Sequence, residues 1–242
     1  MNPPLHRFEE FGRLSEAERQ AVLRMADAPR SIKKGYAIQG EAVPVTGFFI
    51  LLSGWAGAAL TLSNGGRQIM KIHLPGDALG TPSMAMRRTT EELVALTDVT
   101  VAHVSLTDFG QLFDDHPRIV ARFMLSVQQE RIALMDRLAS NGRTPAEART
   151  AAFLLDLLDR LRPLGHVEDD SFEVFASQEQ IGDLLGLTAV HVNRMLRGLT
   201  DLGFLRREGR RFHLINIDAL EQLGARPNRQ PFMDQAWLPN AR

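Results

Sequence analysis

The sequence predicts an α+β protein with an N-terminal β-roll or jelly-roll domain, one long helix and a C-terminal winged helix-turn-helix. Three observations support this fold class. Short apolar runs cut by glycine fill residues 31–105, helical spacing of apolar residues extends from 117 to about 140, and two short capped helices precede a hairpin after residue 177. The expected boundaries are 1–115 for the β-roll domain, 116–142 for the long helix and hinge, 143–224 for the winged helix-turn-helix and 225–242 for a C-terminal tail.

Composition narrows the class of protein before any motif is considered. The 242 residues are 44% hydrophobic and 24% charged, which is ordinary for a globular protein in water. No apolar run approaches the roughly 18 residues of a membrane helix, and the start MNPPLHRFEEFGRL lacks a hydrophobic signal segment. We therefore expect a cytoplasmic protein without a membrane partner. The absence of cysteine excludes disulfides, thiolate zinc sites, a cysteine nucleophile and cysteine-ligated iron–sulfur clusters.

The β-roll domain begins with a short helix and continues as strands. Ser15 and Glu18 have the spacing of a capping box that starts this helix. The run from Phe48 to Leu52 is apolar throughout and predicts a buried strand. Asn64-Gly65 predicts a hairpin, because both residues tolerate positive φ. Many short strands at this spacing indicate a β-roll or jelly-roll barrel.

A brief helix capped by Thr107 and ending near Phe113 should precede the long helix, which is expected to start at Pro117 and to end at Asn141-Gly142. Apolar residues on the long helix recur at alternating steps of four and three, interrupted once by an arginine, which is an a/d seam. The seam predicts a dimer interface, and a single helix covering one face of the barrel is the alternative. The predicted interface residues are Val120, Met124, Val127, Arg131, Leu134 and Leu138.

The C-terminal domain is predicted from helix caps. The segment 144–147, Thr-Pro-Ala-Glu, has the form of a capping box with proline at the first helical position, so the residues before it act as a hinge. Ser177 and Gln180 form another capping box. Gly186 should end that helix and Thr188 should cap the next one, which gives a helix-turn-helix.

The second of these helices carries the residues predicted to read DNA bases. At about 100° per residue, Val192, Leu196 and Leu199 fall on one side of the helix. The opposite side is mixed and carries two arginines. Arginine suits guanine, asparagine suits adenine, and valine can touch a thymine methyl group. The predicted base readers are Val190, Asn193, Arg194 and Arg197.

A strand–turn–strand wing with Glu208-Gly209 at its tip should follow. Between residues 188 and 213 there are six arginines and two acidic residues, although the whole chain has a net charge of -1. Arginines placed in this way can contact phosphates without reading sequence. A solvated hairpin with surface arginines is the alternative. The predicted phosphate contacts are Ser177, Thr188, His191, Arg206, Arg207, Arg210 and Arg211.

The order of β-roll, long helix, hinge and winged helix-turn-helix resembles the Crp/Fnr superfamily of bacterial transcription regulators over about residues 8–220. The string SQEQIGDLLGLTAVHVNRMLRGLTDLGFLRR is similar to the DNA-binding signature of that family, and LLSGWAGAAL, GGRQIMKIHLPGDALG and TDVTVAHVSLTDF are similar to its sensor domain. The resemblance implies a non-enzymatic homodimer that binds a palindromic operator with half-sites about one helical turn apart. Val190 replaces a base-reading glutamate of the best-known members, so the operator should differ. RNA polymerase stays open as a further partner.

The resemblance also indicates a tentative effector pocket, in which Gly76, Asp77 and Gly80 are similar to a turn that meets the ribose of a cyclic nucleotide. The position of the family's phosphate-binding arginine falls on Thr89-Thr90, with Arg87 and Arg88 just before it. A semi-buried phosphate without a cationic partner would be poorly compensated, so we expect no dependence on cyclic AMP. No metal or cofactor is predicted. A cyclic-nucleotide- or haem-dependent regulator, with His6, His73, His103 or His116 as axial ligand, and a β-barrel enzyme or adaptor are the alternatives.

Overall fold

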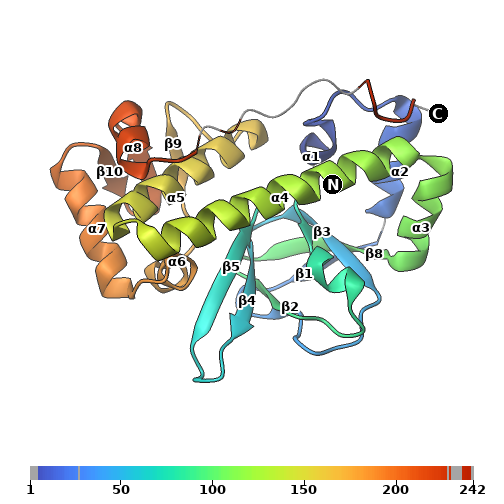
Figure 1. The fold of residues 1–242 in the computed structure, drawn as a ribbon, viewed down its shortest axis with the longest axis horizontal. Helices are drawn as coiled ribbons and strands as arrows, with labels where there is room; N and C mark the ends of the chain where they lie inside the picture. Colours follow the sequence, from blue (N-terminus) through green and yellow to red (C-terminus); the bar gives the residue numbers. More distant parts are fainter. Residues whose placement is uncertain (1–4, 27, 228, 230–235, 241–242) are drawn as a thin grey trace. The chain divides into compact units, whose positions relative to one another are not determined.

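The computed structural model describes residues 5–26, 28–227, 229 and 236–240. It confirms an α+β fold, with a β-roll, one long helix and a C-terminal helix-turn-helix in chain order (Figure 1). The chain divides into two compact units. Unit 1 comprises residues 1–60, 70–132 and 230–242, and unit 2 comprises residues 61–69 and 133–229. Of the predicted tail 225–242, residues 228, 230–235, 241 and 242 lie outside the described residues. No helix in the described ranges is long and apolar enough to cross a membrane.

The β-roll consists of two four-stranded sheets. The first sheet has the order β1 (Pro29–Ile32), β8 (Val99–Ser105), β3 (Gly47–Ser53) and β6 (Ala78–Leu79). The second has the order β2 (Ala37–Gln39), β7 (Glu92–Ala95), β4 (Ala56–Thr61) and β5 (Arg67–His73). The predicted Asn64-Gly65 turn joins β4 to β5, and Gly65 has a φ of 79°.

Residues 48–52 of strand β3 are all apolar because both faces of the strand are covered. Phe48, Ile50 and Leu52 belong to a core cluster that includes residues of the helices, such as Phe109 and Phe123. Phe49 and Leu51, which point the other way, belong to a second cluster between the two sheets. The fully apolar strand predicted from the sequence is therefore confirmed, and its pattern reflects its place between two cores.

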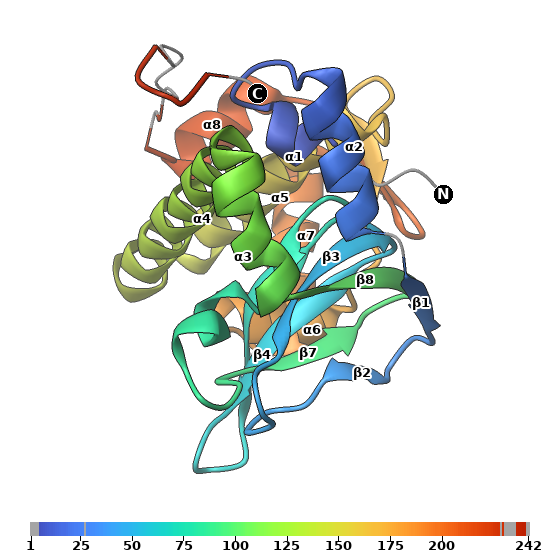
Figure 2. The ribbon, with the colours of Figure 1, turned by 90° about the vertical axis from the view of Figure 1, so that its right-hand side faces the viewer.

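Three helices of unit 1 and residues 117–132 of the long helix lie over one face of the first sheet (Figure 2). They are α1 (His6–Glu9), α2 (Glu16–Met25), α3 (Leu106–Asp115) and α4 (Pro117–Arg143), and the 3-10 helix η1 (Thr81–Ala85) follows β6. The Ser15 capping box of α2 is confirmed. The predicted Thr107 cap is wrong, because α3 begins earlier in the chain, with the side chain of Ser105 accepting a hydrogen bond from the Asp108 amide.

Unit 2 is built around α5 (Ala146–Leu161), whose buried leucines line its core. Then come η2 (Arg162–Leu164), β9 (Ser171–Glu173), α6 (Gln178–Leu185), α7 (Ala189–Asp201), β10 (Leu205–Glu208), β11 (Arg211–Leu214) and α8 (Ile217–Gly224). The predicted Thr144 cap is wrong. Pro145 is the N-cap residue of α5, and the Thr144 hydroxyl instead donates to the Ser140 carbonyl at 3.0 Å.

The predicted wing has a third strand. β10 and β11 form a hairpin in which Leu205 pairs with Leu214 and Glu208 pairs with Arg211, and Gly209 at the tip has a φ of 62°. β9, which was not predicted from the sequence, adds to the other edge of β11, with Phe172 opposite Phe212. It anchors the hairpin to the domain, because Phe172 and Phe212 are both buried.

Candidate nucleic-acid interface

The helix-turn-helix is fixed by hydrogen bonds that the sequence predicts. The Ser177 side chain accepts from the Gln180 amide, and the Gln180 side chain accepts from the Ser177 amide, so the capping box of α6 is confirmed. The helix ends at Gly186, which has a φ of 65°. The Thr188 hydroxyl then caps α7 by accepting from the His191 amide at 3.2 Å. Two of the predicted phosphate contacts, Ser177 and Thr188, thus also serve as helix caps.

A close approach of backbones sets the angle of the turn between α6 and α7. The Leu187 amide donates to the Gly182 carbonyl at 2.9 Å. A β-carbon on Gly182 would overlap the Leu187 carbonyl oxygen and would lie 3.3 Å from the Leu187 carbonyl carbon. Only glycine therefore fits at this position of α6.

Helix α7 has one buried and one exposed face, as its spacing predicts. Val192, Leu196 and Leu199 are buried. Arg194 and Arg197 are exposed, and 79% of the Val190 surface is accessible to solvent. The exposed face of α7 therefore combines one apolar side chain with two cationic side chains.

Asn193, the remaining predicted base reader, lies at the edge of that face. It is half-buried, and its Nδ2 donates a hydrogen bond of 3.2 Å to Oε1 of Gln178, the first residue of α6. Gln178 was not among the residues singled out from the sequence. Only the packing of α6 against α7 brings it to Asn193, and sequence spacing alone carries no signal for the contact.

The four wing arginines have different surroundings. Arg206 lies 3.2 Å from Glu208, and Arg211 lies 2.9 Å from Glu168, both as exposed or half-exposed ion pairs. The Arg207 guanidinium lies 5.0 Å from the centre of the Phe212 ring, and burial lowers its pKa.

The fourth, Arg210, lies near the hairpin tip, 5.9 Å from the Phe175 ring.

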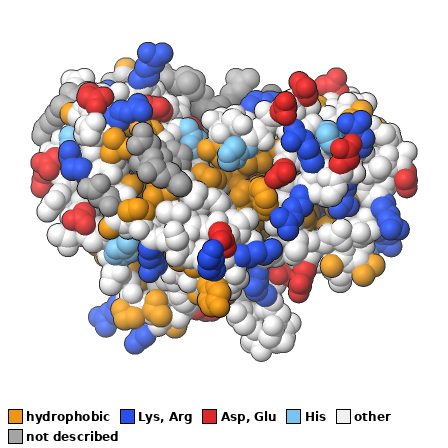
Figure 3. Space-filling view, turned by 180° about the vertical axis from the view of Figure 1, so that it is seen from behind, with side chains coloured by type: hydrophobic (Ala, Val, Ile, Leu, Met, Phe, Trp, Pro, Cys, Tyr) orange, Lys and Arg blue, Asp and Glu red, His pale blue; other side chains and the backbone are white. Residues whose placement is uncertain are grey.

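Cationic and acidic side chains are interspersed over the face of the protein in Figure 3 and form no continuous basic patch there. Arg206 and Arg211 are thus held only by surface ion pairs, which are weak interactions.

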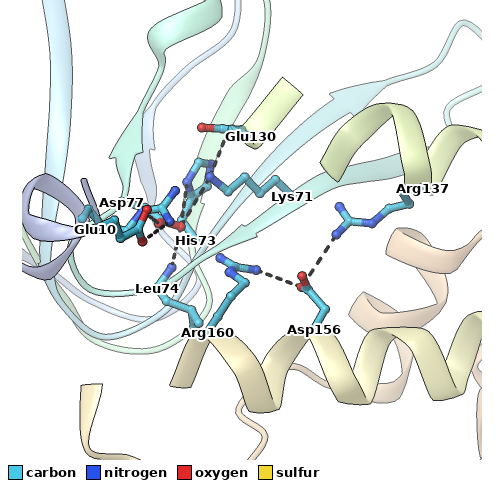
Figure 4. Close-up of polar contacts among 10 residues, drawn as sticks. Glu10, Lys71, His73, Leu74, Asp77, Glu130, Arg137, Asp156 and Arg160 are labelled. Atoms are coloured by element: carbon cyan, nitrogen blue, oxygen red, sulfur yellow. Dashed lines mark hydrogen bonds and ion pairs between the residues drawn. The ribbon is translucent and has the colours of Figure 1, made fainter. Parts of the chain in front are cut away.

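The predicted effector residue Asp77 lies in a buried ionic cluster of unit 1 (Figure 4). One carboxylate oxygen is 3.3 Å from Arg7 Nε, and the other is 3.4 Å from Lys71 Nζ and 3.6 Å from His73 Nδ1. The Leu74 amide also donates to the second oxygen at 3.1 Å. These four contacts occupy the Asp77 carboxylate within the protein.

Helices α1 and α4 complete this cluster. Lys71 Nζ lies 2.9 Å from Glu130 of α4. Burial and the nearby Glu130 raise the pKa of Glu91 to about 6. Gly76 has a φ of 94°, and a β-carbon there would overlap the His6 ring of α1. The Gly76-Asp77 turn thus faces two helices, which gives it a packing role in unit 1.

The predicted phosphate-binding stretch is also engaged within the β-roll. Buried Thr89 donates from its hydroxyl to the Gly40 carbonyl at 2.7 Å and accepts from the Val43 amide at 3.1 Å. Exposed Arg88 donates to the Ala42 carbonyl at 2.6 Å. These contacts hold residues 87–90 against the segment that follows β2.

The other predicted effector residues lie close to this stretch. The Thr90 amide donates to the buried Ser83 hydroxyl at 3.0 Å, Gly80 is buried with a φ of 81°, and Arg87 is exposed. The structure thus brings Gly80 and Thr90 close through η1, whereas Asp77 points into the ionic cluster.

Of the histidines considered as haem ligands, His6 and His73 both border the Gly76-Asp77 turn, whereas His103 and His116 lie elsewhere in unit 1. Burial lowers the pKa of His6 to about 4 and also lowers the pKa of buried His73. His103 Nε2 lies 3.1 Å from the Thr46 hydroxyl, and His116 ends α3. Within the described ranges, no group of three or more His, Asp or Glu side chains is placed to hold a metal ion.

The predicted seam on α4 is divided between two environments. Val120 and Val127 are partly buried against the core beneath the helices, and Leu134 is half-buried. Met124, Arg131 and Leu138 are exposed, and so are two apolar residues that were not in the predicted seam. These exposed apolar residues are Met124, Ile132, Met135 and Leu138.

The fold and the site define a class of protein in which a cyclic-nucleotide-binding-like β-roll is joined to a Crp-type helix-turn-helix. The family model described as "Cyclic nucleotide-binding domain" matches residues 29–116, and the model described as "Crp-like helix-turn-helix domain" matches residues 148–223. The chain belongs to the Crp/Fnr family of transcription regulators.

Two relatives illustrate this membership. The chain is 32% identical over 161 residues to the transcriptional regulatory protein btr of Bordetella pertussis, and 30% identical over 160 residues to the nitrogen fixation regulation protein FixK of Bradyrhizobium diazoefficiens. Each match covers 66% of this chain and 66% of the relative. Both relatives are named as regulators and not as enzymes.

Solved structures agree with the fold. FixK2 from Bradyrhizobium japonicum is 28% identical with a TM-score of 0.74, covering 81% of this chain and 96% of that chain. A CRP/FNR-family transcriptional regulator from Thermus thermophilus is 19% identical with a TM-score of 0.65, covering 82% and 98%, and supports the fold alone.

Proposed function

We propose that this protein is a homodimeric, sequence-specific DNA-binding regulator that acts in the cytoplasm on a palindromic operator. The observation that carries the proposal is the exposed face of α7, where Val190, Arg194 and Arg197 project from a helix whose opposite face is buried. A helix presented in this way fits the major groove, where arginine can bind guanine and valine can touch a thymine methyl group.

The roles of α7 and the wing are separable. Arg194→Ala removes base readout and should cost about 1–3 kcal/mol on the operator while sparing random DNA. The paired substitution Arg210→Ala with Arg211→Ala removes phosphate contacts. It should weaken binding to both DNAs and reduce the slope of log affinity against log salt by about 2.

Fluorescence anisotropy with a selected operator and a scrambled duplex, across a salt series, measures both effects. Equal losses on the two duplexes for Arg194→Ala would contradict base reading, and an unchanged salt slope for the arginine pair would contradict phosphate contact. Gln222→Ala, an exposed and uncharged change on α8 of unit 2, is the control.

The exposed apolar residues of α4 support a dimer. Met124, Ile132, Met135 and Leu138 lie on a helix of 27 residues, and a second copy of α4 would remove them from water. Two copies related by a two-fold axis would present two α7 helices to half-sites about one helical turn apart.

We further propose that DNA binding does not require cyclic AMP and that no iron–sulfur cluster of the cysteine-ligated type is involved. The chain has no cysteine. The Asp77 carboxylate is occupied by Arg7, Lys71 and His73, and the Thr89 hydroxyl is occupied by backbone groups, so neither is poised for a ribose or a cyclic phosphate. Calorimetry with cyclic AMP and cyclic GMP should show no binding at micromolar ligand, and a micromolar dissociation constant would contradict the proposal.

A further inference from the structure

A side-chain hydrogen bond between Gln178 of α6 and Asn193 of α7 joins a residue with no assigned role to a predicted base reader. Asn193 Nδ2 donates to Gln178 Oε1 at 3.2 Å, and both side chains are half-buried. We propose that Gln178 is a positioning residue that orients the Asn193 amide and thereby determines which base Asn193 reads. This inference rests on the proposed function.

The donors and acceptors that remain on the Asn193 side chain determine which base it can read. An asparagine amide has two N–H donors and one carbonyl acceptor. With one N–H donated to Gln178, Asn193 keeps one donor and its Oδ1 acceptor for DNA. Adenine presents the complementary pair in the major groove, the N7 acceptor and the N6 donor. Gln178 therefore favours adenine as the base that Asn193 reads.

The fixed orientation also affects discrimination. A free asparagine amide can turn over and exchange its donor and acceptor, so it can adapt to more than one base. On DNA, the bond to Gln178 opposes that rotation while Gln178 Nε2 donates to a phosphate. The Gln178 amide is then fixed, and turning the Asn193 amide would place its Oδ1 against Gln178 Oε1, two acceptors without a proton between them. A preorganised amide should therefore reject other bases more strongly than a free one.

The Nε2 group of Gln178 can donate a hydrogen bond to a DNA phosphate. Its Nε2 makes no hydrogen bond to a described residue, and Gln178 is the first residue of α6 after the Ser177 cap. An amide N–H at this place can donate to a phosphate oxygen beside the base that Asn193 reads. Gln178 would then link backbone contact and base contact through one side chain.

Two substitutions separate these roles. Gln178→Ala removes the acceptor, so it should relax discrimination at the base read by Asn193 by about three- to tenfold, the range of one hydrogen bond. Gln178→Glu keeps an acceptor for Asn193 but loses the donor, because an ionised carboxylate only accepts. It should preserve the base preference while lowering affinity for all DNA.

The experiment is a binding selection from a randomised duplex library with the full-length protein, followed by sequencing of the enriched sites. Asn193→Ala identifies the position concerned, since it should abolish preference there. Glu179→Ala is the control, because Glu179 is the next residue of α6, and its loss should change overall affinity without changing any base preference.

The outcomes are distinct. Relaxed preference at the Asn193 position in Gln178→Ala, restored in Gln178→Glu, supports the assignment. A wild-type site with unchanged preferences in Gln178→Ala, or relaxation equal in both variants, overturns the assignment and leaves the proposed function intact. A wild-type protein that enriches no sequence overturns the proposed function itself. An unchanged melting temperature shows that Gln178→Ala is folded, and its affinity for scrambled duplex should fall as in Gln178→Glu, because both variants lose the Nε2 donor.

Discussion

Replacing Gly182 with alanine should destabilise the helix-turn-helix, although the same substitution usually stabilises a helix. In an exposed helix interior, Gly→Ala normally stabilises by about 1 kcal/mol. At Gly182 the added methyl group would overlap the Leu187 carbonyl oxygen and would lie 3.4 Å from the Thr188 carbonyl carbon. These are backbone atoms of the turn that cannot rotate away, so we take the upper part of the overpacking range, about 3 kcal/mol. The net effect is a loss of about 2 kcal/mol.

Two other glycines of the same motif provide matched controls. A β-carbon on Gly198, inside α7, would meet only Glu147 Oε1 at 3.1 Å, the end of a flexible side chain, so Gly198→Ala should stabilise by up to about 1 kcal/mol. Gly186 has a φ of 65° and open space around it, so Gly186→Ala should cost only the left-handed strain of about 1–2 kcal/mol.

Hydrogen exchange followed by mass spectrometry reports the opening free energy of amides in α6 and α7 directly. A loss of about 2 kcal/mol corresponds to exchange about 30 times faster in Gly182→Ala, whereas Gly198→Ala should slow exchange by up to about fivefold. Similar exchange in these two variants would refute the close-approach argument.

Three further predictions concern α4 and the buried ionic groups. Leu138→Glu places a charge on a side chain that is 77% exposed, so it should leave the fold intact and yield monomers in sedimentation equilibrium; a mass equal to that of the wild-type dimer would contradict the α4 interface. The pKa of Glu91 is raised to about 6 in the folded protein, so its contribution to stability should fall as the pH rises from about 4.5 to 6. The pKa of His6 is lowered to about 4, so its contribution to stability should be lost as the pH falls from about 6.5 to 4. Scanning calorimetry of Glu91→Gln and His6→Gln across that range should show opposite changes in the pH slope, and unchanged slopes would count against the buried environments. Arg118 lies 2.6 Å from buried Glu18, so Arg118→Met should cost about 3–5 kcal/mol. Glu18→Gln with Arg118→Met removes both charges but keeps an acceptor for the Ser15 amide, so it should cost much less; a double variant as unstable as the single one in urea denaturation would contradict this pairing.

The sequence predicts those parts of the fold that depend on local chemistry. The capping boxes at Ser15 and Ser177, the Gly186 helix end and the two faces of α7 all follow from spacing within a few residues. The fully apolar run of β3 likewise predicts burial on both faces.

The two wrong caps show that a local capping sequence does not always predict the first residue of a helix. Thr107 and Thr144 both have acceptable capping sequences, yet Ser105 caps α3 and Thr144 bonds back to the last turn of α4. In α3 one hydroxyl-bearing residue replaces another as the cap, whereas α5 begins at Pro145 without a side-chain cap.

The candidate site shows the same division. Spacing on one helix suffices to predict that Arg194 and Val190 are exposed, but the contact between Gln178 and Asn193 needs two helices in place. The ionic cluster at Asp77 needs α1, β5 and α4 together, so a resemblance in the Gly76-Asp77 turn could not reveal it.

The central claim is that a dimer of this chain reads a specific DNA sequence through α7. Sequencing of duplexes selected by the purified wild-type protein from a random library, at fixed salt, tests it most directly. We expect one enriched pseudo-palindromic site, with half-site centres about 10–10.5 base pairs apart, whose enrichment is lost in Arg194→Ala. A wild-type selection with no enriched sequence, or an enriched site that Arg194→Ala selects equally well, would contradict the claim.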